Sequence, residues 1–139
     1  MQRLMRRLIT PLVLLTASCG GDDPFSPTIE NVAGSYVATA FTATQSGVTT
    51  NLLNLGASLE IVLDGNGTTA GRLFAPGLGE EGEDIDVDLS GTWALQGDAV
   101  TFEQPGDTFV RDVPFVASRN QLQAEDTFGT VLIRVTLTK

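Results

Sequence analysis

Apolar and polar residues alternate most regularly between positions 85 and 95 of this 139-residue sequence. One phase holds Ile85, Val87, Leu89, Gly91, Trp93 and Leu95, and the other holds Asp86, Asp88, Ser90, Thr92 and Ala94. Because the side chains of a β-strand point alternately to opposite faces, this pattern predicts a strand with one dry face and one wet face.

Shorter runs of the same kind, separated by turn residues, continue along the chain from Asn31, and no stretch has a convincing helical period. Asp64-Gly65-Asn66-Gly67 supplies residues that tolerate positive φ and therefore predicts a tight hairpin. Pro114 lacks an amide hydrogen, so we expect its strand to be bulged or to lie where that donor is not needed. The predicted strands are Gly34–Phe41, Ala57–Leu63, Thr68–Phe74, Ile85–Leu95, Ala99–Glu103, Phe109–Ala117, Gln121–Glu125 and Val131–Lys139.

These strands predict an all-β fold of about eight strands in up-and-down order. Eight antiparallel strands of this length either close into a small barrel or fold as a sandwich. The meander order and the hairpin-length turns favour the antiparallel barrel.

The first 18 residues have a different pattern. Arg3, Arg6 and Arg7 precede an apolar run over residues 8–15, and small residues follow it. This order is typical of a secretory signal peptide. The apolar run is much shorter than the ~20 residues of a permanent membrane-spanning helix.

Leu15-Thr16-Ala17-Ser18-Cys19 resembles the lipobox of bacterial lipoproteins, although Thr16 stands where Leu is usual. The resemblance implies cleavage before Cys19, acylation of its thiol and a further acyl chain on the new N-terminus. The alternative is an ordinary secretory signal that ends near a cysteine. Cys19 has no intrachain partner for a disulfide, and lipidation would remove that exported thiol.

The predicted organisation is therefore a signal peptide over residues 1–18, a lipidated flexible tether over 19–28 and a barrel domain over 29–139. The tether is polar and contains Pro24 and Pro27. An Asp after the lipidated cysteine retains many such proteins on the inner membrane. Gly20 takes that place here, so the resemblance implies anchoring of the protein in the outer membrane through Cys19.

The net charge of the mature chain limits the classes of molecule that it can bind. Five cationic and all 17 acidic residues follow Ser18, so the side chains sum to −12. Such a chain repels nucleic acid and anionic lipid headgroups. We therefore expect a covalent membrane anchor, no nucleic-acid partner and a monomer.

Histidine is absent and the single cysteine is assigned to lipid, which excludes Ser/His/Asp and Cys/His catalysis and the zinc and haem sites built on those ligands. The acidic run over residues 80–88 could bind Ca²⁺ weakly, but a solvated loop is favoured. No glycine-rich phosphate loop is present. No enzyme activity, metal or cofactor is expected.

Gly34-Ser35-Tyr36 and Gly91-Thr92-Trp93 resemble the Gly-x-aromatic units of lipocalin-like domains, and the resemblance extends over about residues 29–139. It implies that Tyr36 closes one end of the barrel, with Arg134 as the candidate last-strand cation against it. It also implies a ligand held inside the barrel.

Arg111 breaks the alternation, because it shares a phase with Phe109, Val113 and Phe115. An inward guanidinium requires a partner, which is either a carboxylate of this chain or the acidic head of a fatty-acid-like ligand. The remaining alternative is that Arg111 lies at a strand edge that leaves it in contact with water. Gly91 and Gly71 are interpreted as gaps in the interior. The predicted ligand-binding residues are Arg111, Trp93, Tyr36, Phe109 and Phe115.

Two functions fit these patterns. The first is a barrel that binds a small apolar or amphipathic ligand. The second is a solidly packed lipoprotein whose surface binds a protein partner in the envelope. The first function predicts an open cavity inside the barrel, and the second predicts an interior filled by side chains.

Overall fold

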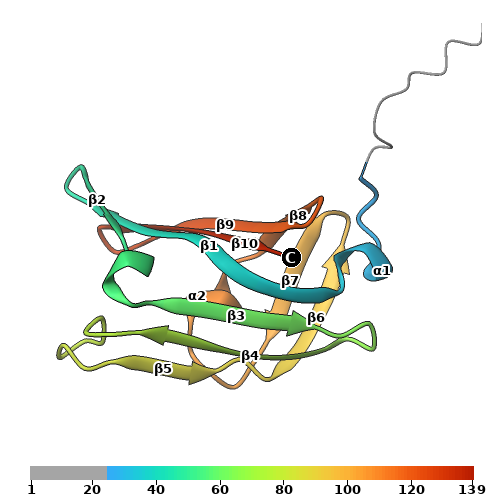
Figure 1. Ribbon diagram of the computed structural model, residues 1–139, viewed down its shortest axis with the longest axis horizontal. Coiled ribbons are helices and arrows are strands. Elements are labelled where there is room, and N and C mark those ends of the chain that lie inside the picture. Colours follow the sequence, from blue (N-terminus) through green and yellow to red (C-terminus); the bar gives the residue numbers. More distant parts are fainter. Residues whose placement is uncertain (1–24) are drawn as a thin grey trace, which may run out of the picture.

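The computed structural model describes residues 25–139 (Figure 1). The predicted signal peptide, Cys19 and most of the predicted tether lie outside the described residues.

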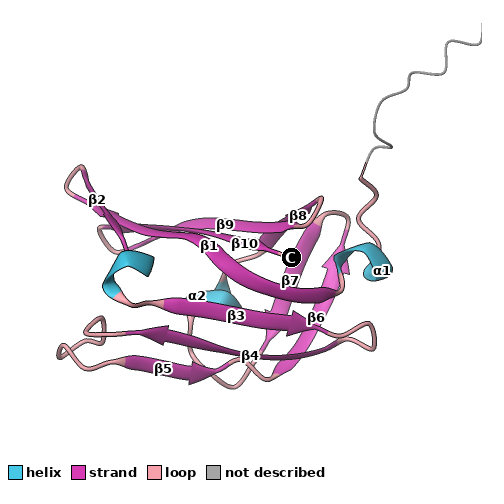
Figure 2. Cartoon of the chain, in the orientation of Figure 1, coloured by secondary structure: helices cyan, strands magenta, loops and turns pink. Residues whose placement is uncertain are grey.

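Ten strands, two one-turn α-helices and a short 3₁₀-helix (η1) make up the described chain (Figure 2). In chain order they are α1 (Ile29–Val32), β1 (Gly34–Gln45), β2 (Val48–Asn51), η1 (Leu53–Leu55), β3 (Ser58–Leu63), β4 (Thr68–Ala75), β5 (Ile85–Asp88), β6 (Gly91–Gln96), β7 (Ala99–Glu103), α2 (Phe109–Asp112), β8 (Phe115–Ser118), β9 (Gln121–Phe128) and β10 (Val131–Thr138).

Eight of the strands form a closed antiparallel barrel in the order β1-β3-β4-β6-β7-β8-β9-β10, and β10 pairs back with β1. Successive ring strands follow one another along the chain, so the predicted up-and-down barrel is confirmed. Two short strands lie beside the ring: β2 pairs with β1, and β5 pairs with β4.

In Figure 1 the barrel is flattened into two layers, with β1, β9 and β10 above and β3, β4 and β5 below. The strands β6 and β7 cross between the layers near α1. We call the end at α1 and the β3–β4 turn the closed end. The opposite end, formed by η1, the β4–β5 loop and the β9–β10 turn, is called the open end.

The strand predicted over residues 85–95 is divided in two at Leu89-Ser90. Both parts follow the same edge of β4, because the Leu89 amide donates to the Gly71 carbonyl (3.0 Å). The carbonyl of Leu89 accepts hydrogen bonds from Thr69 Oγ1 (2.7 Å) and Gln104 Nε2 (2.9 Å). The alternating burial nevertheless runs unbroken from 85 to 95, as predicted.

The strand predicted over Phe109–Ala117 is wrong in its first half. Residues 109–112 form the one-turn helix α2, and only Phe115–Ser118 is a strand, β8. Pro114 lies between the two elements, where its missing amide donor breaks no ladder.

A β-bulge between Ala38 and Ala40 changes the phase of β1. Tyr36 and Ala38 face the core before the bulge, and Phe41 faces it afterwards. The bulge thus lets one long strand contribute an aromatic residue to each end of the barrel.

Gly71 and Gly91 are not interior gaps. A Cβ on Gly71 would lie 2.1 Å from the Glu60 carbonyl oxygen, and one on Gly91 would lie 2.1 Å from that of Glu103. Each glycine instead permits close approach of neighbouring backbones.

Candidate functional site

Tyr36 and Trp93 belong to the packed closed end. The Tyr36 side chain is almost fully buried, and its hydroxyl donates to the Val32 carbonyl of α1. Trp93 is 6% exposed, and its Nε1 donates to the Asp64 carbonyl at 2.7 Å. Burial raises the pKa of Tyr36 above its ordinary value. These two aromatic side chains therefore seal one end of the barrel.

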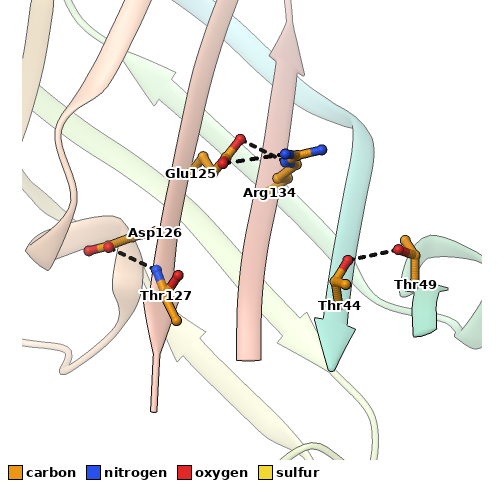
Figure 3. A network of polar contacts seen from close by, with 6 residues as sticks. All are labelled: Thr44, Thr49, Glu125, Asp126, Thr127 and Arg134. Carbon is orange, nitrogen blue, oxygen red and sulfur yellow. Dashed lines mark hydrogen bonds and ion pairs between the residues drawn. The ribbon is translucent and has the colours of Figure 1, made fainter. Parts of the chain in front are cut away.

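The cation against Tyr36 comes from Lys139, so the assignment to Arg134 is wrong. Lys139 Nζ lies 5.7 Å from the centre of the Tyr36 ring and donates to the carbonyls of Asn31 (2.8 Å) and Ala33 (2.9 Å). Arg134 points out of the barrel, where its Nε donates to Glu125 Oε2 at 2.6 Å (Figure 3). An outward position follows from the register of β10, because Val135 on the opposite phase is buried.

The other contacts in Figure 3 lie on the strands that flank β10, with β1 and its partner β2 on one side and β9 on the other. Thr44 and Thr49 share a hydroxyl hydrogen bond of 2.8 Å across the β1–β2 hairpin. The Asp126 carboxylate accepts from the Thr127 amide (2.8 Å). These contacts stabilise the hairpin and strand surfaces.

Phe115 is fully buried in the core. Its ring packs edge to face on Phe102, with centroids 5.6 Å apart. The prediction that Phe115 lies inside the barrel is confirmed, but it fills the interior and does not line a cavity at the open end.

Arg111 does not point into the barrel from a strand, and that part of the prediction is wrong. On helix α2 its side chain is turned about 200° away from that of Phe109, whereas two residues apart on a strand would share a face. Arg111 Nη2 donates to Asp107 Oδ1 (2.6 Å), and its Nε donates to Asp112 Oδ1 (2.8 Å). The hydrogen bond to Asp112 is the largest cause of its raised pKa. Its observed partners are therefore carboxylates of this chain.

A large apolar pocket lies at the open end, between the two layers of the barrel. Its volume is about 700 Å³, and 11 of its 15 lining residues are apolar. Both layers contribute, because β1, β9 and β10 supply one wall and β4 and β5 supply the other. The apolar lining consists of Phe41, Ala43, Leu52, Leu73, Ala75, Leu78, Ile85, Phe109, Phe128, Val131 and Ile133. We call this cavity the open-end pocket.

Two aromatic rings meet at the open-end pocket. The Phe41 ring, turned inward by the β1 bulge, packs against Phe109 of α2 with centroids 5.6 Å apart. Phe109 is thus the one predicted ligand-binding residue that lines the pocket, while Arg111 lies beside it on the same helical turn.

The four polar residues of the pocket are Glu80, Asp107, Thr108 and Asp112. Thr108 is 8% exposed, and its hydroxyl oxygen is fully buried without a hydrogen-bond partner among the described residues. The polar lining is therefore acidic, with one buried hydroxyl beside it.

Sequence reasoning missed the residues that surround the pocket mouth. Leu78 lies in the β4–β5 loop and is 43% exposed, and Phe128 lies at the β9–β10 turn and is 39% exposed. A large apolar side chain beside a turn is a signal that could have identified them, since turns are usually polar.

Two carboxylates of the acidic run over residues 80–88 are held by contacts with the β4–β5 loop and with strand β4. Asp84 accepts from the Gly77 amide, and Asp86 forms a two-pronged pair with Arg72 (2.7 Å for both bonds). Within residues 25–139, no three metal-binding side chains converge. The same part of the chain has no helix with the length and apolar character of a membrane span.

No family model, no curated protein and no solved structure matches the chain at a significant level. The function is therefore argued from the open-end pocket and from the sequence.

Proposed function

We propose that this chain is a lipid-anchored binding protein of the bacterial cell envelope, which holds one small apolar or amphipathic molecule in the open-end pocket. The observation that carries the proposal is the pocket itself. Its volume of about 700 Å³ and its largely apolar lining are those of a small-molecule site, for which about 300–1,000 Å³ is usual.

The packing of the barrel supports this location. An eight-stranded barrel has an interior that its own side chains can fill or that can hold one small ligand. Here the two halves differ: Tyr36, Trp93 and Phe115 fill the closed end and the centre, and the pocket lies beyond Phe41. The packed half would give a ligand a rigid floor.

Binding is tested with N-phenyl-1-naphthylamine, an uncharged apolar dye that fluoresces when it leaves water. The protein is the mature chain, residues 19–139, with Cys19→Ser, so that no acyl chain competes for the pocket. It keeps every described element. We expect saturable binding of one dye per chain.

A matched pair of variants on β1 locates the dye. Ala43 lines the pocket, whereas Ala40 on the same strand is exposed on the outer face. Ala43→Phe should weaken dye binding at least about tenfold, which corresponds to about 1.4 kcal/mol. Ala40→Phe should leave binding unchanged. A parent chain that binds no dye saturably, or equal effects of the two variants, would reject the proposal.

The anchor is tested separately in cells. The basic, apolar and small-residue order that ends at Cys19 supports lipidation at that residue. Several acyl chains on one residue would give an effectively permanent membrane attachment. Cys19→Ser should abolish incorporation of labelled fatty acid and leave an uncleaved precursor. Normal maturation of the variant, with recovery in the lipoprotein fraction, would contradict the assignment.

A further inference from the structure

Three of the four polar residues that line the open-end pocket lie close together in the chain. Asp107, Thr108 and Asp112 all belong to α2 or the residues just before it, and Glu80 comes from the β4–β5 loop. Three of the four are carboxylates, and the fourth is a hydroxyl. A ligand in this pocket would meet hydrogen-bond acceptors at these four residues.

The charges of this group do not cancel. Arg111 neutralises one negative charge, because its guanidinium contacts one oxygen each of Asp107 and Asp112. None of the other four cations in residues 25–139 lines the pocket. The polar lining therefore keeps two net negative charges, and the acidic head of a fatty acid would be repelled there.

We propose that the open-end pocket selects amphipathic cations, in which an apolar body lies between the barrel layers and a protonated amine faces the acidic lining formed by Glu80, Asp107 and Asp112. This inference rests on the proposed binding function and specifies its ligand class. Apolar burial supplies most of the affinity. The three carboxylate residues are all exposed, so they supply chiefly the discrimination between head-group charges.

The test compares three molecules with the same ten-carbon chain, decylamine, decanol and decanoate, as displacers of N-phenyl-1-naphthylamine from the mature Cys19→Ser chain. Concentrations stay below micelle formation, and the buffer is near neutral pH. Decylamine should displace the dye at about one tenth of the decanoate concentration, with decanol between them. The difference between the two charged molecules should shrink at high salt, because the carboxylates are exposed to solvent.

Variants separate local selection from the overall negative charge of the protein. Glu80→Gln with Asp107→Asn should weaken decylamine binding severalfold and leave decanol unchanged. Glu103→Gln, which removes an exposed carboxylate of β7 away from the pocket, should change neither.

The outcomes are distinguishable. Dye binding combined with equal or tighter binding of decanoate would overturn the cation preference and leave the proposed function standing. An equal loss of decylamine binding in Glu103→Gln would also overturn it, because the preference would then be a property of total charge. Absence of saturable dye binding would reject both proposals together.

Discussion

Replacing Trp93 tests whether the closed end is the packed half of the barrel. Trp93 lies on β6, is 6% exposed, and belongs to the core cluster. Its Nε1 donates to the Asp64 carbonyl in the β3–β4 turn at 2.7 Å. The side chain thus ties a turn to the core through one hydrogen bond in addition to its packing.

Two substitutions separate these contributions. Trp93→Phe keeps an aromatic ring and removes the indole donor, so it should lower the free energy of unfolding by about 1–2 kcal/mol, from the lost hydrogen bond and some lost packing. Trp93→Ala removes the ring as well and should cost about 3–5 kcal/mol. Domains of this size have about 5–15 kcal/mol in total, so Trp93→Ala consumes a large share of the stability.

The assay is urea unfolding followed by far-ultraviolet circular dichroism. Trp93 is the only tryptophan, so its fluorescence is lost in both variants. The wild-type emission should be blue-shifted in the folded state and move to the solvated wavelength on unfolding. Ala94→Ser, at the adjacent exposed position, is the control and should stay within about 0.5 kcal/mol of wild type. A loss below about 1 kcal/mol in Trp93→Ala, with the urea dependence unchanged, would refute the packed closed end.

Three further changes follow from described contacts. Gly91→Ala should lower the free energy of unfolding in urea by about 1–3 kcal/mol, because its Cβ would lie 2.1 Å from the Glu103 carbonyl oxygen, whereas Gly65→Ala in open space should be tolerated. Thr108→Val should raise the melting temperature by a few degrees, since removing an unpartnered buried hydroxyl stabilises the fold by about 1 kcal/mol; a lower melting temperature would contradict this. Burial raises the pKa of Tyr36 above 10.0, so the stability that its neutral phenol contributes is present below pH 10 and is lost as pH rises through the folded-state pKa. Because Tyr36 is the only tyrosine, phenolate absorbance measures this titration directly, and Tyr36→Phe should flatten the alkaline loss of stability.

The alternation of apolar and polar residues was sufficient to predict the barrel, because it reports which side of each strand faces the core. Residues 85–95 show how robust this signal is: the strand is interrupted at Leu89, yet every residue keeps its predicted side. The alternation of buried and exposed side chains therefore continues across the interruption between β5 and β6.

The open-end pocket could not be predicted in the same way. Helix α2 has four residues, which is too few for a helical period to be recognised. The sequence pattern therefore predicted a strand at Arg111, with its side chain directed into the barrel. The bulge that turns Phe41 toward the pocket depends on pairing with β10, a partner far away in the sequence. Gly91 looked like a gap because the pattern shows the missing side chain and not the neighbouring backbone that occupies its place.

The ring of the barrel closes between the first and the last strand, and this has a consequence for how the chain folds. Thr39 and Thr138, which share a hydroxyl hydrogen bond, are 99 positions apart. Such long-range pairs form slowly, since the entropy of closing the intervening loop must be overcome first. The chain is synthesised with its N-terminus first, so one edge of β1 stays unpaired until β10 has been made. An unpaired strand edge is prone to aggregate. We therefore expect the barrel to complete its folding only after the last strand, β10, is available to pair. The pairing of β1 with β10 should be the slow step.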